Sequence, residues 1–147
     1  MTRAPSPALL DALAKLLGPK GYTTDADIMA PWLTDWRGKY TGRAAAMLSP
    51  GSTEKVAAIV RLCADAGVAL VPQGGNSGMV GGATPDVGGN QLLLSLRRMN
   101  RVRSIDTAAR SAVAEAGVIL ETFHHEALTH GLRFPLNLGG KGSATIG

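Results

Sequence analysis

Residues 72–82 read Pro-Gln-Gly-Gly-Asn-Ser-Gly-Met-Val-Gly-Gly, and the interpretation of the whole chain begins with this glycine-rich loop. Five of its eleven residues are glycine. Glycine adopts positive φ angles and lets consecutive backbone N–H groups turn toward one point. Asn76 and Ser77 add side-chain donors. The loop therefore predicts a cradle for phosphate groups, although a flexible surface loop or hairpin can have the same composition.

The residues before the loop predict a β-strand, an α-helix and a second β-strand. The first strand covers residues 46–48 and the second covers 68–71. The helix between them begins at Ser52 or Thr53 and ends at Gly67, a typical left-handed terminator. Its predicted buried face consists of Val56, Ile59, Val60 and Cys63. The unit is a βαβ motif with an expected right-handed crossover, and the loop leaves the carboxyl end of its second strand, where open α/β sheets bind ligands.

The remaining elements are assigned from periodicity and turn residues. We expect strands at 91–96, 102–105 and 112–114 and a helix over 118–130. The inward face of that helix is predicted to consist of Leu120, Phe123, Ala127 and Leu128. An earlier helix begins at Ser6-Pro7 and is stopped by Gly18-Pro19, whereas residues 20–44 are expected to be irregular. The pattern as a whole predicts an α+β fold.

Two common phosphate-binding motifs do not fit the chain. The Rossmann fingerprint requires G-x-G-x-x-G, but Gly75, Gly78 and Gly81 are each separated by two residues. The Walker motif requires a hydroxyl residue directly after its lysine, but Gly142 stands between Lys141 and Ser143. The sequence therefore argues against both a nicotinamide Rossmann domain and a P-loop nucleotidase.

The charge composition indicates which classes of ligand and partner the chain can bind. Fifteen Lys and Arg against eleven Asp and Glu give a charge of +4, which favours anionic ligands. The basic residues are scattered and lack an aromatic platform, so no nucleic-acid partner is predicted. Arg97, Arg98, Arg101 and Arg103 do cluster, and we interpret them mainly as a solvated turn and strand edge, with an anionic ligand as the alternative.

Other features predict a chain without metal, disulfide or membrane span. His124 and His125 do not stand three or four residues from His130, so no metal site is expected. The single cysteine, Cys63, cannot form a disulfide within the chain and is interpreted as a small buried residue. No run of 18 apolar residues occurs, so no membrane span is predicted. The N-terminus lacks a signal-peptide core, and a cytoplasmic location is expected.

Four stretches of the sequence together resemble a known family. They are VPQGGNSGMVGG from residue 71, LLLSLRRMNRV from 92, AGV from 116 and PLNLGGKGSATIG from 135. In this order they resemble the FAD-binding domain of the vanillyl-alcohol oxidase and p-cresol methylhydroxylase (PCMH) type. The most similar branch contains D-2-hydroxyglutarate dehydrogenases, D-lactate dehydrogenases and the FAD subunit of glycolate oxidase. The resemblance runs from about Asp35 to the last residue.

The resemblance implies a domain organisation. Residues 1–44 would form an N-terminal helix and irregular lead-in, and residues 45–147 a PCMH-type FAD-binding domain. Within that domain, a small parallel βαβ subdomain would precede the start of a second, mixed or antiparallel subdomain. Residues 143–147 read as the entry into another element, so we expect the domain to be incomplete at its C-terminus.

The resemblance also implies which residues contact FAD. Residues 73–78 would hold the pyrophosphate, residues 81–82 would face the adenosine half, and residues 135 and 139–143 would lie along the ribityl chain and flavin. Ile146 and Gly147 would open the next contacting turn. The implied cofactor-binding set is Pro72, Gln73, Gly74, Gly75, Asn76, Ser77, Gly78, Met79, Gly81, Gly82, Pro135, Gly139, Gly140, Lys141, Gly142, Ser143, Ile146 and Gly147. Lys141 has an alternative reading as a solvated loop lysine.

Non-covalent attachment of FAD is expected from two positions. Relatives with covalent FAD use a histidine in the first glycine loop, about where Asn76 stands. Others use a cysteine in the second glycine-rich stretch, and residues 134–147 contain none.

The implied activity is oxidation of a D-2-hydroxy acid by hydride transfer to FAD. A quinone or an electron-transfer flavoprotein would then accept the electrons. The family's catalytic base and metal site belong to a later domain, so no catalytic residue is assigned and the chain alone is expected to be inactive. Half of a two-part site would expose apolar surface, which predicts weak FAD affinity and self-association. The alternatives are a non-catalytic FAD or nucleotide-binding module and a basic interaction domain without cofactor.

Overall fold

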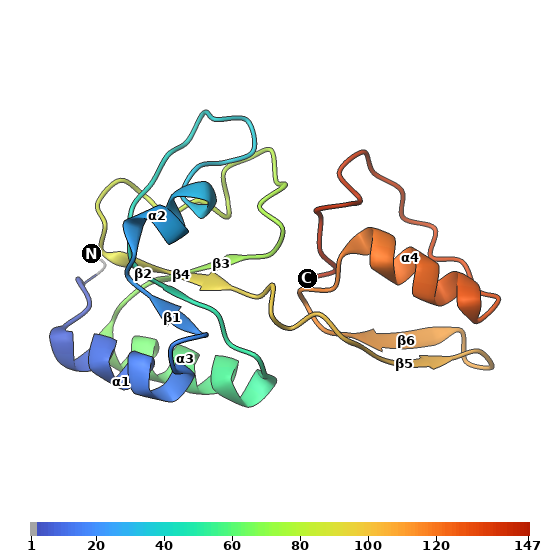
Figure 1. Ribbon diagram of the computed structural model, residues 1–147, viewed down its shortest axis with the longest axis horizontal. Coiled ribbons are helices and arrows are strands. Elements are labelled where there is room, and N and C mark those ends of the chain that lie inside the picture. The colour runs from blue at the N-terminus through green and yellow to red at the C-terminus, as the bar shows by residue number, and fades with distance from the viewer. Residues whose placement is uncertain (1–2) are drawn as a thin grey trace.

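A computed structural model describes residues 3–147, so the first two residues of the predicted lead-in lie outside the described residues. The chain forms two units side by side (Figure 1). The N-terminal unit, residues 3–98, contains a four-stranded sheet with helices on both faces. The C-terminal unit, residues 99–147, contains a two-stranded sheet and one helix. This arrangement is the predicted α+β fold with a parallel and an antiparallel part.

The larger sheet has the strand order β1-β2-β4-β3. β1 (Tyr22–Thr23) is antiparallel to β2 (Ala44–Leu48). β4 (Gln91–Ser95) is parallel to both β2 and β3 (Leu70–Gln73). The predicted strand, helix and strand are therefore present, but the later strand β4 lies between β2 and β3. All three parallel strands end at the same edge of the sheet, which is where the glycine-rich loop begins.

Helices α1 (Pro7–Leu17) and α3 (Thr53–Ala66) cover one face of this sheet. The caps are as predicted, because the Ser6 and Ser52 side chains accept hydrogen bonds from the first turns and Gly67 adopts φ 66°. The core under these helices consists of Leu9, Leu13, Leu17, Ala46, Leu48, Ile59, Cys63, Val68, Leu92 and Leu94. Burial of each large aliphatic side chain contributes roughly 1.5–3 kcal/mol. The predicted burial of Val60 is wrong, since that side chain is 46% exposed.

The lead-in is more regular than the sequence predicts. Besides β1, it contains α2 (Ala26–Met29) and a 3₁₀ turn, η1 (Ala30–Trp32). They cover the other face of the sheet, where Met29 packs with Met47 and Leu93. These elements are too short to show a helical or strand period, which is why residues 20–44 read as irregular.

The C-terminal unit pairs β5 (Val102–Asp106) with β6 (Ser111–Ala114) in an antiparallel hairpin, as predicted. Helix α4 (Leu120–Thr129) lies along the hairpin (Figure 1). The expected inward residues of α4 are buried except Leu128, which is 64% exposed. The prediction for Leu128 is therefore wrong, because the two short strands do not cover that side of the helix.

Candidate functional site

The glycine-rich loop begins two residues later than the sequence predicts. Pro72 and Gln73 belong to β3, where they align with Leu94 and Ser95 of β4. The Gln73 side chain is 1% exposed, and its Nε2 donates hydrogen bonds to the carbonyls of Trp32 and Ala83, both at 2.9 Å. Gln73 thus ties the two ends of the loop to each other and to η1. Its buried Oε1 has no hydrogen-bond partner among the described residues.

The backbone of the loop leaves a run of N–H groups free. Within residues 3–147, the N–H groups of residues 75–82 donate to no backbone or side-chain acceptor. Asn76 and Gly81 have positive φ angles of 52° and 73°. Consecutive free N–H groups with such turns form an anion-binding concavity. This arrangement fits the pyrophosphate of a dinucleotide, which several main-chain donors can hold together.

The side chain of Asn76 has a different contact from the one that the sequence suggests. Its Nδ2 donates to the carbonyl of Thr34 at 2.8 Å, so this nitrogen fixes the left-handed turn of the loop. Ser77 and Met79 line a cavity with Trp36. A direct contact of Asn76 with the cofactor stays a prediction, whereas its role in shaping the loop is visible in the structure.

The two glycine-rich stretches lie against each other. A Cβ atom on Gly74 would collide with the Thr145 side chain, and one on Gly75 would collide with the Ser143 carbonyl. A side chain at either position would push the stretches apart. The structure thus brings together residues that are about 70 positions apart in the sequence. The glycines are needed here for close backbone approach as well as for flexibility.

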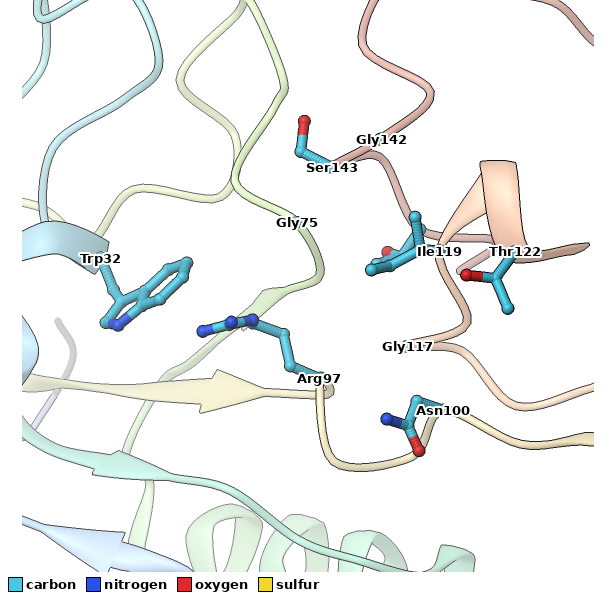
Figure 2. Close-up of a pocket in the computed structure, with 10 residues that line it drawn as sticks. Trp32, Gly75, Arg97, Asn100, Gly117, Ile119, Thr122, Gly142 and Ser143 are labelled. Carbon is cyan, nitrogen blue, oxygen red and sulfur yellow. The ribbon is translucent and has the colours of Figure 1, made fainter.

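Three cavities surround the loop. The first, of about 350 Å³, lies between the two units and is lined by Gly75, Arg97, Ile119 and Ser143 among others (Figure 2). The second, of about 620 Å³, lies between Ser77 and the second glycine-rich stretch. The third, of about 550 Å³, follows residues 80–82. These volumes are within the range of small-ligand and cofactor sites.

A loop of the lead-in, residues 33–42, flanks the glycine-rich loop. Its Asp35 side chain is buried and accepts hydrogen bonds from the N–H groups of Tyr40, at 2.6 Å, and Arg37, at 3.2 Å. The bond from Tyr40 is the main cause that lowers the pKa of Asp35. The Tyr40 ring packs on Gly81, where a Cβ would lie 2.8 Å from it. Trp36 and Tyr40, both largely exposed, line two different cavities.

Sequence reasoning did not assign a role to this lead-in loop. The stretch DWRGKYTG carries a recognisable turn signal, since Asp35 precedes Gly38 by three residues and Asp and Gly favour the first and last positions of a turn. The signal predicts a turn, but it does not reveal that the turn lies against residues 40 positions later in the chain.

The second glycine-rich stretch is mostly exposed. Lys141 Nζ lies 3.3 Å from Glu121 Oε1, and both side chains are nearly half exposed. The N–H groups of Ile146 and Gly147 donate to the carbonyls of Val118 and Ala116. Of the remaining predicted contacts, Gly139, Gly140 and Gly142 line the second cavity, Gly82 lines the third, and Pro135 and Gly78 are exposed.

The arginines of the basic cluster, residues 97–103, bind different protein partners. Arg98 Nη1 donates to the carbonyls of Ser49 and Lys20. Arg101 and Arg103 both contact Oε1 of Glu115 at 3.1 Å, and the Glu115 side chain is 1% exposed. The backbone N–H and the guanidinium of Arg101 are the main causes that lower the pKa of Glu115 to about 2. The interpretation of the cluster as a solvated turn and strand edge is confirmed, because all four arginines are exposed, and Arg98, Arg101 and Arg103 additionally bind protein oxygens there.

Residues 3–147 contain no group of three or more His, Cys, Asp or Glu side chains that could hold a metal ion. No helix in that range is long and apolar enough to cross a membrane.

Comparison with known families matches residues 44–147 to a family described as the FAD binding domain. Curated relatives include a mitochondrial D-2-hydroxyglutarate dehydrogenase of Arabidopsis thaliana, 38% identical over 133 residues, which are 90% of this chain and 23% of the relative. The bovine mitochondrial D-2-hydroxyglutarate dehydrogenase is 38% identical over 94% of this chain and 25% of the relative. The chain thus spans about a quarter of the length of these relatives.

Solved structures share the fold over almost the whole chain. An alkyldihydroxyacetonephosphate synthase superimposes with a TM-score of 0.83 at 22% identity, covering 100% of this chain and 32% of that protein. A substrate-bound p-cresol methylhydroxylase gives 0.77 at 21% identity, covering 94% and 27%. The 4-ethylphenol oxidase of Gulosibacter chungangensis gives 0.74 at 26% identity, covering 95% and 27%. These likenesses confirm the predicted PCMH-type fold.

The free N–H groups, the contact between the glycine-rich stretches and the match over residues 44–147 agree on one cofactor. The prediction of FAD is therefore confirmed, while the contact of each predicted residue with FAD stays a prediction. The chain belongs to the FAD binding domain family, with the fold of the p-cresol methylhydroxylase type.

Proposed function

We propose that the chain is the FAD-binding part of an enzyme that oxidises a D-2-hydroxy acid, of the D-lactate, D-2-hydroxyglutarate or glycolate class, by hydride transfer to FAD. Support comes from the curated relatives, which are named for D-2-hydroxyglutarate dehydrogenase and, in Schizosaccharomyces pombe, D-lactate dehydrogenase. The main structural support for FAD binding is the close contact of Gly75 with Ser143, next to a run of N–H groups that have no protein acceptor.

Bound FAD supplies the hydride acceptor, and the residues of this chain hold it in place. The N–H groups of residues 75–82 have no protein acceptor within the described chain, so they are available to bind an anion. Gln73 and Asn76 keep the loop in this shape through their bonds to Trp32, Ala83 and Thr34. We assign no catalytic base to residues 3–147, and we expect the chain alone not to turn over substrate.

FAD is proposed to bind non-covalently. By the family resemblance, Asn76 stands about where covalent relatives carry a histidine, and an amide nitrogen is not a nucleophile. The one thiol, Cys63, is 1% exposed, and burial raises its pKa, which disfavours the reactive thiolate. The thiol also lies in the core beneath α3, on the face of the sheet opposite to η1.

The partners and location belong to the same proposal. A quinone or an electron-transfer flavoprotein would accept the electrons, the chain would associate with itself, and nucleic acid is not an expected partner. We propose a cytoplasmic location for this chain, although several relatives are named as mitochondrial proteins.

A titration of the 147-residue chain with FAD, followed by quenching of flavin fluorescence, tests the proposed site. A Cβ on Gly78 would meet no atom within 4 Å, so Gly78→Ala leaves the fold unstrained. A bound pyrophosphate would meet that methyl group, and we expect an increase in Kd of about tenfold. The matched control is Gly51→Ala, whose new Cβ would lie 3.7 Å from Arg98, away from the loop.

The outcomes separate binding from folding. Both variants should keep the melting temperature of the unsubstituted chain, and Gly51→Ala should keep its Kd. Equal FAD affinity in Gly78→Ala and the unsubstituted chain would show that the loop does not contact the cofactor there. Steady oxidation of D-lactate or D-2-hydroxyglutarate by the 147-residue chain would contradict the expectation that it is inactive alone.

A further inference from the structure

The glycine-rich loop contains no charged side chain, although the pyrophosphate of FAD carries negative charge. Main-chain N–H groups supply partial charges, and a nearby cation would add a full one. Among the residues that line the three cavities around the loop, Arg97 is the one basic residue. It lies in the first cavity together with Gly75 of the loop and Ser143 of the second glycine-rich stretch.

The ring of Trp32 holds the guanidinium of Arg97 in place. The guanidinium carbon lies 3.9 Å from the centroid of the Trp32 ring, a cation–π contact (Figure 2). Trp32 is itself fixed, since its carbonyl accepts the hydrogen bond from Gln73 and its side chain packs against the cluster of Met29, Met47 and Leu93. The same residue, Gln73, therefore anchors both the glycine-rich loop and the backbone of Trp32, whose ring contacts Arg97.

The hydrogen-bonding capacity of Arg97 is unused within residues 3–147. Its neighbours Arg98, Arg101 and Arg103 all donate to protein oxygens, and Lys141 pairs with Glu121. The guanidinium of Arg97 donates to no described acceptor and forms no described ion pair. A guanidinium has five N–H donors in a planar fork that matches phosphate oxygens.

We propose that Arg97, oriented by Trp32, binds and neutralises the pyrophosphate of FAD from the cavity beneath the glycine-rich loop. The inference rests on the proposed function, because it assigns a further residue to the same cofactor site. Charge-assisted hydrogen bonds to phosphate are among the stronger polar contacts, so Arg97 should contribute about a tenfold increase in affinity. That contribution should weaken as salt is added, because the site is partly open to solvent.

The test compares three ligands in Arg97→Gln and in a matched control, Arg61→Gln. Gln keeps polar donors but removes the charge. Arg61 lies on the exposed side of α3, across the sheet from η1, and loses one charge in the same way. FAD and ADP both carry the pyrophosphate, whereas riboflavin carries no phosphate. Kd for each ligand is measured by fluorescence or calorimetry at low and high salt, and melting temperature reports the fold.

We expect Arg97→Gln to weaken FAD and ADP about tenfold at low salt, with riboflavin affinity, melting temperature and the Arg61→Gln control unchanged. Arg97→Lys should recover part of the loss. Equal FAD affinity in Arg97→Gln and the unsubstituted chain would overturn the inference alone. A parallel loss for riboflavin would also overturn it, by showing that Arg97 acts only through packing. Absence of FAD binding by the unsubstituted chain would overturn the proposed function and this inference together.

Discussion

The N-terminal and C-terminal units are stabilised by different means. Both hydrophobic clusters that the described residues form lie in the N-terminal unit, where β4 is buried along almost its whole length. The C-terminal unit contains a two-stranded hairpin, and such a hairpin is only marginally stable alone. Several of its apolar side chains are exposed, including Val113, Leu128 and Leu136.

Ionic contacts add to the few buried apolar side chains of the C-terminal unit, which include Val118, Leu120 and Phe123. Glu115 follows β6, and it binds Arg101, before β5, and Arg103, within β5. Arg103 also reaches Thr53 of the N-terminal unit at 3.3 Å. The ion group therefore closes the base of the hairpin and joins the two units.

This difference matters because the candidate site lies at the junction. The glycine-rich loop is anchored on the well-packed sheet, whereas the stretch that faces it, residues 139–147, belongs to the sparsely packed unit. A ligand that contacts both stretches would stabilise the folded state by mass action, and its largest effect would fall on the C-terminal unit.

The largest expected effect is the loss of stability in Leu92→Ala, which we compare with Leu128→Ala in the other unit. Leu92→Ala removes a fully buried side chain from the N-terminal core and should lower the free energy of unfolding by about 2–5 kcal/mol. Leu128→Ala acts on a side chain that is 64% exposed and should change it by less than about 0.5 kcal/mol. Urea denaturation followed by circular dichroism measures both. A loss above about 1 kcal/mol for Leu128→Ala would break the comparison, by showing that its side of α4 is covered in solution.

Local signals predicted most of the secondary structure. Ser6, Ser52 and Gly67 mark helix ends through contacts with their own neighbours, and the structure confirms all three. The burial of Val60 and Leu128 was predicted from helical periodicity alone. The width of the face that a helix buries, however, depends on the element that packs against it. That partner is a distant strand or hairpin that the local sequence does not specify.

The candidate site, like the secondary structure, was predictable where local sequence signals determine it. The composition of residues 72–82 predicts a phosphate cradle, and the resemblance identifies FAD. The start of the loop was placed two residues early because Pro72 is usually a strand breaker, yet it occupies the edge strand β3, where its missing N–H is tolerated. The contacts of Asn76 with Thr34 and of Arg97 with Trp32 join residues 42 and 65 positions apart, and no local pattern encodes them.

A pH titration of stability sharpens the ionic side of the comparison. The pKa of Glu115 is lowered in the folded chain from 4.5 to about 2. Its contribution to stability is therefore complete above pH 4.5 and is lost as the pH falls from 4.5 toward 2. Glu115→Gln removes this contribution, so the variant should be less stable at pH 7, and its deficit should shrink below pH 4.5. Urea midpoints of both proteins across this range measure the deficit, and a constant deficit would mean that Glu115 acts through packing.

The smallest effect is expected for the exposed pair of Lys141 and Glu121, which joins the second glycine-rich stretch to α4. Both side chains are nearly half exposed, and such ion pairs contribute about 0–1 kcal/mol because water and salt screen them. Lys141→Gln should therefore change the free energy of unfolding by less than about 0.5 kcal/mol in urea denaturation.

If the same variant raises the Kd for FAD, Lys141 acts on the cofactor, as the family resemblance implies. If its FAD affinity is unchanged, Lys141 is a surface lysine, and the cations of the site reduce to Arg97. Either result separates the contacts that hold the C-terminal unit together from the contacts that bind its ligand.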